Sequence, residues 1–569
     1  MIHFLLSRRS GTQRMVCAWL AAMGTASFAA GSADLSNARE PVAPPLLPAV
    51  PAAGFTLPPV AAPEAARSGV AGAVRVTPQA ILFRGNTVVS TQALERLAEP
   101  YLKRGLTDAD LESLRLLVTR FYVEQGFVNS GAVLSADAVA GNRLTLDLVE
   151  GRLSYIRLRG LEHLNESYVV KRLVPDENAV FNADALRERY QLLLEDPLFE
   201  RLNARVIPDQ RPGEAVLDIE ATRAPAFHAT LSVNNYRPVS IGETGYTLAK
   251  GVRNLSGYGD LLDASLQAGA DNMGDGRYTL SWRIPLNAHG TGFSYQLEHG
   301  ESSVLEQPLK TLGIGSTIDA RDIGLSQVVQ ESLRHKLTLG VNQVERENRT
   351  TLLGQPFSFT VGELDGVTKV STSRLWGEYS ARDERHVMVA RLTTSQSSNN
   401  LQDVTGLPGS TPQASHSYRT WLAQFQYARE VMESGAQLAV RATAQSAEQS
   451  LVALDRMAIG GVSTVRGYRE NYLIRDTGRV VNLEFHYPVR LDGVRDAKLD
   501  VAPFYDHGEG QNVGEGVDAL SSAGVAVHFA THGFSVDVAL AQRLQHPDPQ
   551  PDSGALQDKS IHLQVSYAF

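Results

Sequence analysis

The sequence has 569 residues, of which 43% are hydrophobic and 20% charged, and its formal net charge is −9. This composition excludes a disordered chain and, with a mean hydropathy of −0.16, a bundle of membrane helices. A membrane β-barrel stays compatible, because its strands alternate lipid-facing and lumen-facing side chains. The acidic balance argues against nucleic acid as a partner. The single cysteine, Cys17, excludes an intramolecular disulfide and a cysteine-based metal site.

The N-terminus predicts a secretory signal peptide over residues 1–33. Three arginines in the first 14 residues precede a nearly uncharged stretch, residues 15–30, which ends in small residues. A membrane anchor is the alternative, although the stretch is shorter than the ~20 residues that usually span a bilayer. Residues 34–74 are rich in proline and alanine and predict a semi-rigid linker, with an amphipathic helix or a ligand segment as alternatives.

Two tandem α+β modules are predicted next, over residues 75–151 and 152–224. In each, the pattern indicates a strand, two helices and two strands, so that one helical face packs on a small three-stranded sheet. The second helix of the first module is expected over Thr107 to Gln125, where Thr107 and Asp110 have the form of a capping box. An edge strand of such a sheet can pair with a visiting extended chain. A module without a partner is the alternative.

From residue 225 to 569 the pattern changes to segments that alternate apolar and polar side chains. At the C-terminus, for example, Ile561, Leu563 and Val565 share one parity, and His562 and Gln564 share the other. Sixteen such segments lie near residues 228, 244, 260, 276, 291, 308, 331, 366, 385, 416, 434, 479, 496, 521, 533 and 558. An even number suits a closed antiparallel membrane barrel, because lipid offers no partner to a free sheet edge. A soluble β-sandwich or propeller is the alternative.

Two motifs lie in this region. The longest interruption, Glu448 to Gly478, falls between the eleventh and twelfth strands and contains Val465, Arg466, Gly467 and Tyr468. The thirteenth strand ends in a second motif with Phe504, Asp506 and Gly508. Asp506 has the parity of the lumen-facing residues, so a loop folded into the barrel would bring Arg466 to it as a charge-assisted pair. A solvated loop arginine and a separately satisfied carboxylate are the alternative.

These motifs, the two modules and the terminal Phe569 together resemble the Omp85 superfamily, and specifically the two-partner secretion transporters (TpsB) of the ShlB/FhaC/HecB type. The resemblance covers residues 75–569. It implies two POTRA modules followed by a 16-stranded antiparallel transmembrane β-barrel. It also implies that the sixth extracellular loop folds inward, that Arg466 locks to Asp506, and that Phe569 is part of a barrel-assembly signal. Many members have an N-terminal plug helix, which the prolines between Pro41 and Pro63 disfavour.

The resemblance further implies an outer-membrane location, with the POTRA modules in the periplasm, and transport without catalysis. The expected partner is a large secreted exoprotein with an N-terminal secretion domain. Outer-membrane lipid and, during biogenesis, the barrel-assembly machinery and periplasmic chaperones are also expected partners. No cofactor or metal is expected, and no P-loop pattern for ATP is present in the sequence.

Other functions remain as alternatives. They are an insertase that assembles other barrels, a diffusion porin or receptor, and an enzyme. The sequence has no GxSxG or HExxH motif. His507 and Asp506 do not suit a catalytic dyad, because neighbours in a strand point to opposite faces.

Overall fold

The computed structural model describes residues 55–56, 74–135, 137–176, 178–211, 213–404, 413–491, 496–545 and 553–569. The predicted signal peptide, most of the predicted linker and the region considered for a plug helix lie outside these residues. The chain forms two compact units, one spanning Pro51–Ala224 and one containing Pro225–Phe569. No helix in the described part of the chain is long and apolar enough to cross a membrane.

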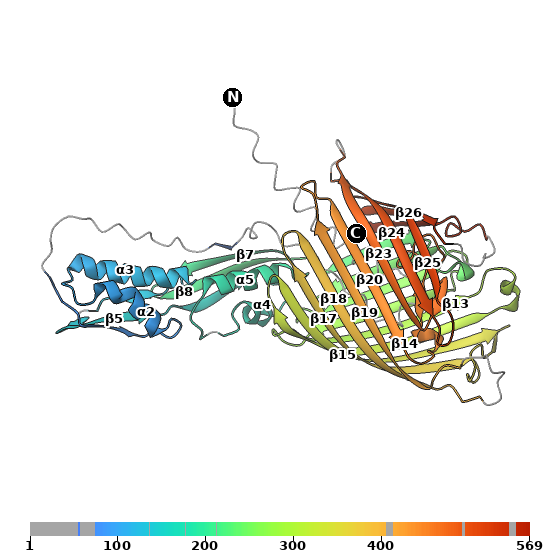
Figure 1. Ribbon diagram of the computed structural model, residues 1–569, viewed down its shortest axis with the longest axis horizontal. Helices are drawn as coiled ribbons and strands as arrows, with labels where there is room; N and C mark the ends of the chain where they lie inside the picture. The colour runs from blue at the N-terminus through green and yellow to red at the C-terminus, as the bar shows by residue number, and fades with distance from the viewer. Residues whose placement is uncertain are drawn as a thin grey trace, which may run out of the picture. The chain divides into compact units, whose positions relative to one another are not determined.

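The first module has the predicted order of elements (Figure 1). These are β2 (Ala80–Arg84), α2 (Thr91–Ala98), α3 (Asp108–Glu124), β3 (Gly131–Val133), β4 (Val139–Ala140) and β5 (Arg143–Val149). The capping box of α3 is present: the Thr107 backbone N–H donates to Asp110 at 2.9 Å, and the Asp110 N–H donates to the Thr107 hydroxyl at 3.3 Å. The apolar face of α3, with Leu114, Val118 and Tyr122, is fully buried in the module's core.

The second module repeats this order with β6 (Arg152–Arg159), α4 (Glu166–Leu173), α5 (Ala183–Leu194), β7 (Phe199–Pro208) and β8 (Glu214–Arg223). The prediction of three-stranded sheets was wrong, because each sheet gains a two-residue strand. In the first module β4 pairs with β5, and in the second β1 (Phe55–Thr56), from the predicted linker, pairs in parallel with β7. A two-residue strand is too short to carry an alternating pattern, so neither strand is visible in the sequence.

Hydrogen bonds to backbone carbonyls join the two modules. The Ala183 N–H donates to the Gly126 carbonyl at 2.8 Å, and the Asn129 amide donates to the Gly213 carbonyl at 2.9 Å. Gly126 has a positive φ of 88°, which a glycine adopts without strain, and a side chain there would collide with Asn182. The two modules therefore form one compact unit rather than two independent domains.

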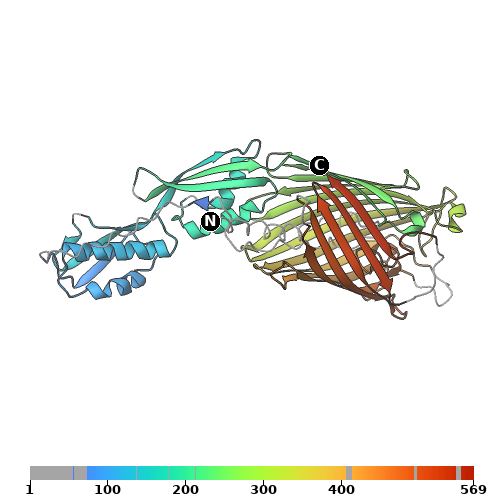
Figure 2. The same cartoon turned by 90° about the horizontal axis from the view of Figure 1, so that it is seen from above.

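Sixteen antiparallel strands close into a barrel, as predicted (Figures 1 and 2). They are β9 (Phe227–Asn234), β10 (Gly245–Arg253), β11 (Leu261–Gly269), β12 (Gly276–Pro285), β13 (Thr291–Ser303), β14 (Gly315–Glu331), β15 (His335–Leu352), β17 (Val367–Arg382), β18 (His386–Asn399), β19 (Ser417–Glu430), β20 (Gln437–Ala447), β23 (Thr477–Val489), β24 (Lys498–Gln511), β25 (Asp518–Thr531), β26 (Phe534–Arg543) and β27 (Ile561–Ala568). The two-residue β16 (Gln355–Pro356) pairs with β15. The last strand pairs with the first, which we call the seam; Figure 2 shows the red final strands and the green first strands in one wall.

The wall has the predicted two faces. Large apolar side chains such as Leu231, Leu325 and Leu483 are exposed on the outside, whereas Asn482 and His562 are buried on the inside. The end of the barrel where β9 begins has short connections, such as residues 332–334 and 383–385. The opposite end has the long ones, including residues 448–476. This asymmetry gives the barrel one simple end and one end rich in loops.

Candidate functional site: an inward loop locked to the barrel wall

Residues 448–476, which we call the inward loop, join β20 to β23 at the loop-rich end. They contain β21 (Met457–Ile459) and β22 (Leu473–Arg475), which pair with each other. The first half of the loop is attached to lumen-facing side chains. Asp455 accepts a hydrogen bond from the Tyr418 hydroxyl of β19 at 2.5 Å and forms an ion pair with Arg346 of β15. The Arg346 guanidinium also donates to the Leu454 carbonyl at 2.8 Å. The loop therefore lies against the inside of the wall.

The structure brings Arg466 and Asp506 together inside the barrel. The Arg466 Nε and Nη2 atoms donate to the two carboxylate oxygens of Asp506, each at 2.7 Å, and the Arg466 backbone N–H donates to Asp506 at 3.1 Å. The Asp506 side chain is 0% exposed and that of Arg466 is 7% exposed. A bidentate pair fixes both the position and the orientation of the guanidinium, because both groups are planar.

Three further wall residues complete the arginine's surroundings, and the sequence analysis missed two of them. Glu484 of β23 pairs with Arg466 Nη2 at 2.8 Å, and the Arg466 guanidinium lies 3.6 Å from the ring centroid of Phe504. Asn482 donates to Asp506 at 2.8 Å and to the Thr464 carbonyl at 2.5 Å. Their lumen-facing parity on β23 was visible in the sequence, but nothing there indicated which lumen residues the loop would reach.

The motif's other residues explain how the loop approaches so closely. Val465 is fully buried among apolar residues of the loop and wall. A β-carbon on Gly508 would lie 2.8 Å from the Val465 side chain and 2.7 Å from that of Ile459, so only glycine leaves room for the loop. The Tyr468 hydroxyl lies 2.9 Å from the Ser521 carbonyl and 2.7 Å from that of Gln545.

Gly467 contacts polar groups of β26, of β27 and of the connection between them. Its N–H donates to His562 Nε2 at 3.0 Å, and its carbonyl accepts from Arg543 at 2.5 Å and from the Ser560 hydroxyl at 2.9 Å. Its φ is +92°, and a β-carbon would lie 2.8 Å from that of Ala541. The backbone here therefore requires glycine.

Phe569, predicted as part of an assembly signal, lies at the simple end of the barrel. Its N–H donates to the Ala229 carbonyl at 2.9 Å, and its ring packs edge-on against Tyr567 at 4.8 Å between centroids. Its side chain is exposed on the rim. Its role in assembly stays a prediction.

Comparison with known proteins identifies the family. Residues 213–531, more than half of the chain, match the family described as haemolysin secretion/activation protein ShlB/FhaC/HecB. Residues 76–151 match the ShlB-type POTRA domain. The chain belongs to this family. It is an outer-membrane two-partner secretion transporter with its POTRA modules in the periplasm, and it works with a secreted exoprotein.

Relatives of this transporter are distant in sequence but similar over most of their length. The heme/hemopexin transporter protein HuxB of Haemophilus influenzae is 24% identical, over 82% of this chain and 83% of that protein. The outer membrane transporter CdiB of Dickeya dadantii is 21% identical, over 83% of this chain and 84% of that protein. Among solved structures, CdiB from Escherichia coli has a TM-score of 0.68 at 17% identity, covering 98% of this chain and 97% of that one.

The transporter also shares its fold with a protein of the wider Omp85 group. BamA from Haemophilus ducreyi, lacking POTRA domains 1–3, has a TM-score of 0.51 at 12% identity and covers 87% of this chain. The end of the barrel where β9 begins, next in sequence to the POTRA modules, is the periplasmic end. The inward loop therefore starts and ends at the extracellular side. Among the described residues, no group of three or more His, Cys, Asp or Glu side chains is placed to hold a metal ion.

Proposed function

We propose that this transporter captures its unfolded exoprotein with the POTRA modules and threads it through the barrel, with the inward loop as the element that must move. The observation that carries this proposal is the buried pair of Arg466 and Asp506 inside a closed wall. A network of hydrogen bonds of this kind holds a loop in one defined place. We propose that these bonds break together when the exoprotein chain competes with the loop for the lumen.

Capture is proposed to use the exposed edge of the second module's sheet. The order of that sheet is β1-β7-β8-β6, so β1 covers part of the β7 edge and β6 forms the other edge. On β6, Tyr155 is 59% exposed and is flanked by arginines at positions 152 and 157. An extended segment of the exoprotein can add to such an edge through backbone hydrogen bonds, while its side chains meet the tyrosine and the arginines.

We propose that the protein performs no catalysis. Asp506 is fully buried against Arg466, whereas the neighbouring His507 lies on the other face of β24 and contacts the Ser521 hydroxyl at 2.8 Å. These two side chains therefore cannot act on one substrate. Folding of the exoprotein outside the cell supplies the direction of movement, since a folded domain cannot return through the barrel.

The other proposed partners follow from the barrel surface. Outer-membrane lipid covers the exposed apolar side chains of the wall, and the barrel-assembly machinery and periplasmic chaperones handle the chain before it folds. The exoprotein itself is proposed to be large and to carry an N-terminal secretion domain. The name of HuxB mentions heme/hemopexin, whereas the name of CdiB mentions no cargo. The two names therefore do not identify the exoprotein that this transporter exports.

Comparative proteomics of the culture medium tests the proposal. We expect that cells without the transporter lose one large exoprotein from the medium and retain their other outer-membrane barrels. Removal of both POTRA modules, residues 75–224, is expected to abolish export while the barrel still inserts. Normal export by that variant would refute capture by the POTRA modules. An unchanged medium with depleted outer-membrane barrels would instead indicate an assembly insertase.

A further inference from the structure

The seam between β9 and β27 is short, and Asn235 extends it at its extracellular end. β27 pairs with five residues of β9, from Asn234 to Thr230, whereas β10 pairs with eight. Beyond this register, Asn235 continues the seam. Its backbone N–H donates to the Leu563 carbonyl at 3.2 Å, its side-chain oxygen accepts from the Leu563 N–H at 2.8 Å, and its amide donates to the Ile561 carbonyl at 2.9 Å.

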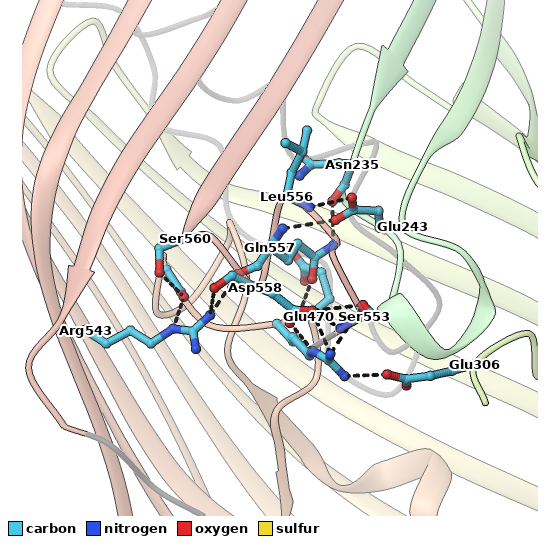
Figure 3. Close-up of polar contacts among 12 residues, drawn as sticks. Asn235, Glu243, Glu306, Glu470, Arg543, Ser553, Leu556, Gln557, Asp558 and Ser560 are labelled. Carbon is cyan, nitrogen blue, oxygen red and sulfur yellow. Dashed lines mark hydrogen bonds and ion pairs between the residues drawn. The ribbon is translucent and has the colours of Figure 1, made fainter. Parts of the chain in front are cut away.

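Gln557, just before β27, joins this end of the seam to the inward loop. Its side chain is fully buried. The Gln557 amide donates to the carbonyls of Asn235 and Arg237, at 2.6 and 2.8 Å, and its side-chain oxygen accepts from the Glu470 N–H of the inward loop at 2.8 Å (Figure 3). One amide group therefore bonds to both the start of the barrel and the loop.

A carboxylate from the first extracellular connection fixes the same segment. Glu243 accepts from the backbone N–H groups of Leu556 and Gln557, at 2.7 and 3.1 Å. Figure 3 shows Asn235 and Glu243 on one side of residues 553–560 and Glu470 on the other. We call residues 553–560 the clasp.

Arg469 of the inward loop adds charged contacts to the clasp. Its guanidinium donates to the two carboxylate oxygens of Asp558, at 2.5 and 2.9 Å, and to Glu306 at 2.9 Å. The Arg469 side chain is 8% exposed and that of Asp558 is 12% exposed, so the pair is shielded from water. Glu306 belongs to the connection between β13 and β14, far from the seam in the strand order.

We propose that the clasp couples the inward loop to closure of the seam. With the loop docked, Gly467, Arg469 and Glu470 hold the clasp. The clasp in turn holds Asn235 and the extracellular end of β9 against β27. When the loop leaves, Asp558 loses its bidentate partner and the Gln557 oxygen loses its donor, so the clasp loosens and the seam frays from its extracellular end. Given the proposed function, a chain that displaces the loop also relaxes the wall at this one place.

Hydrogen–deuterium exchange of the purified full-length protein tests the coupling without any cargo. Arg469→Ala removes a loop contact and leaves every seam residue intact, so faster exchange at the seam would report coupling rather than local damage. The matched control is Arg475→Ala, which removes an arginine of the same loop whose partner, Asp518 at 2.5 Å, lies on β25. Gln557→Leu, of similar size, breaks the clasp directly.

In Arg469→Ala and Gln557→Leu, we expect amides in residues 231–235 and 561–565 to exchange about tenfold faster or more, because buried and charged hydrogen bonds are lost. Amides of β18 and β19 keep their wild-type rates, and Arg475→Ala leaves the seam unchanged. The double variant should add little to either single change, since both remove one linkage. Unchanged seam exchange in Arg469→Ala would overturn the proposal. So would an equal rise in all strands, because that reports general destabilisation. If Arg469→Ala loses export while its seam amides exchange at the wild-type rate, the proposed function stands and coupling through the clasp is refuted.

Discussion

Replacement of Arg466 by alanine is expected to release the inward loop from the wall. The change leaves Asp506 without its cation and takes one of two partners from Glu484, which keeps His486 Nε2 at 2.9 Å. The side chains of Asp506 and Glu484 are only 0% and 14% exposed. Breaking a buried ion pair by removing one partner costs about 3–5 kcal/mol. Since about 1.4 kcal/mol is a factor of ten, the ratio of docked to undocked loop falls about a hundredfold to a few thousandfold.

Two further variants show whether the effect comes from the charge of Arg466, from its bidentate geometry or from its position in the loop. Arg466→Lys keeps the positive charge but loses the bidentate contact and the planar group over Phe504, so an intermediate loss of about 1–3 kcal/mol is expected. Arg475→Ala is the control within the same loop. The side chains of Arg475 and Asp518 are 21% and 52% exposed, and such a pair contributes about 1 kcal/mol or less.

The assay combines protease access with export. Intact cells are treated with an external protease, and cleavage within residues 448–476 is followed over time, while the exoprotein in the medium is measured relative to the amount of folded barrel. We expect the order alanine, lysine, control, from most to least cleaved, and the reverse order for export. An Arg466→Ala protein that is abundant, as protected as the wild type and fully active in export would refute the reasoning from the buried pair.

Three other outcomes are expected. Gly467→Ala should weaken loop docking by about 1–2 kcal/mol from the positive φ alone, with more from the contact with Ala541, seen as faster loop cleavage. In the second POTRA module, the hydrogen bond from Arg205 holds the pKa of Asp218 below its usual value. That stability is present above about pH 4 and is lost as the pH falls through the lowered pKa, so Asp218→Asn should flatten the acid-unfolding profile of the POTRA unit. Deletion of Phe569 should reduce the amount of folded, heat-modifiable barrel in outer membranes. An unchanged amount would show that assembly does not need this residue.

Local patterns in the sequence predicted most of the secondary structure. The capping residue Thr107 marks the start of α3, because its hydroxyl satisfies a helix N–H that has no partner within the helix. Strand positions were predictable in the barrel, because each strand has one face in lipid and one in the lumen, and the side-chain period is two. Short strands such as β1 and β4 were not, since two residues contain no period.

The motif around Arg466 was also visible, but only part of its surroundings was. The sequence indicated that Asp506 faces the lumen, and the resemblance to a known family paired it with the arginine. Glu484 and Asn482 face the same lumen, yet alternation gives only the face of a side chain and not its neighbours around the barrel. Which of them meets the loop depends on strand register and on the path of the loop.

The sequence by itself determined the two α+β modules, the sixteen strands and the glycine and arginine of the loop, because those depend on neighbours along the chain. Only the tertiary structure decided the clasp. Gln557 bonds to Asn235, which is 322 positions away, and Arg469 bonds to Glu306, which is 163 positions away. A buried amide and a buried arginine look like ordinary surface residues in a sequence. Their partners are set by closure of the barrel, which brings the first strand beside the last.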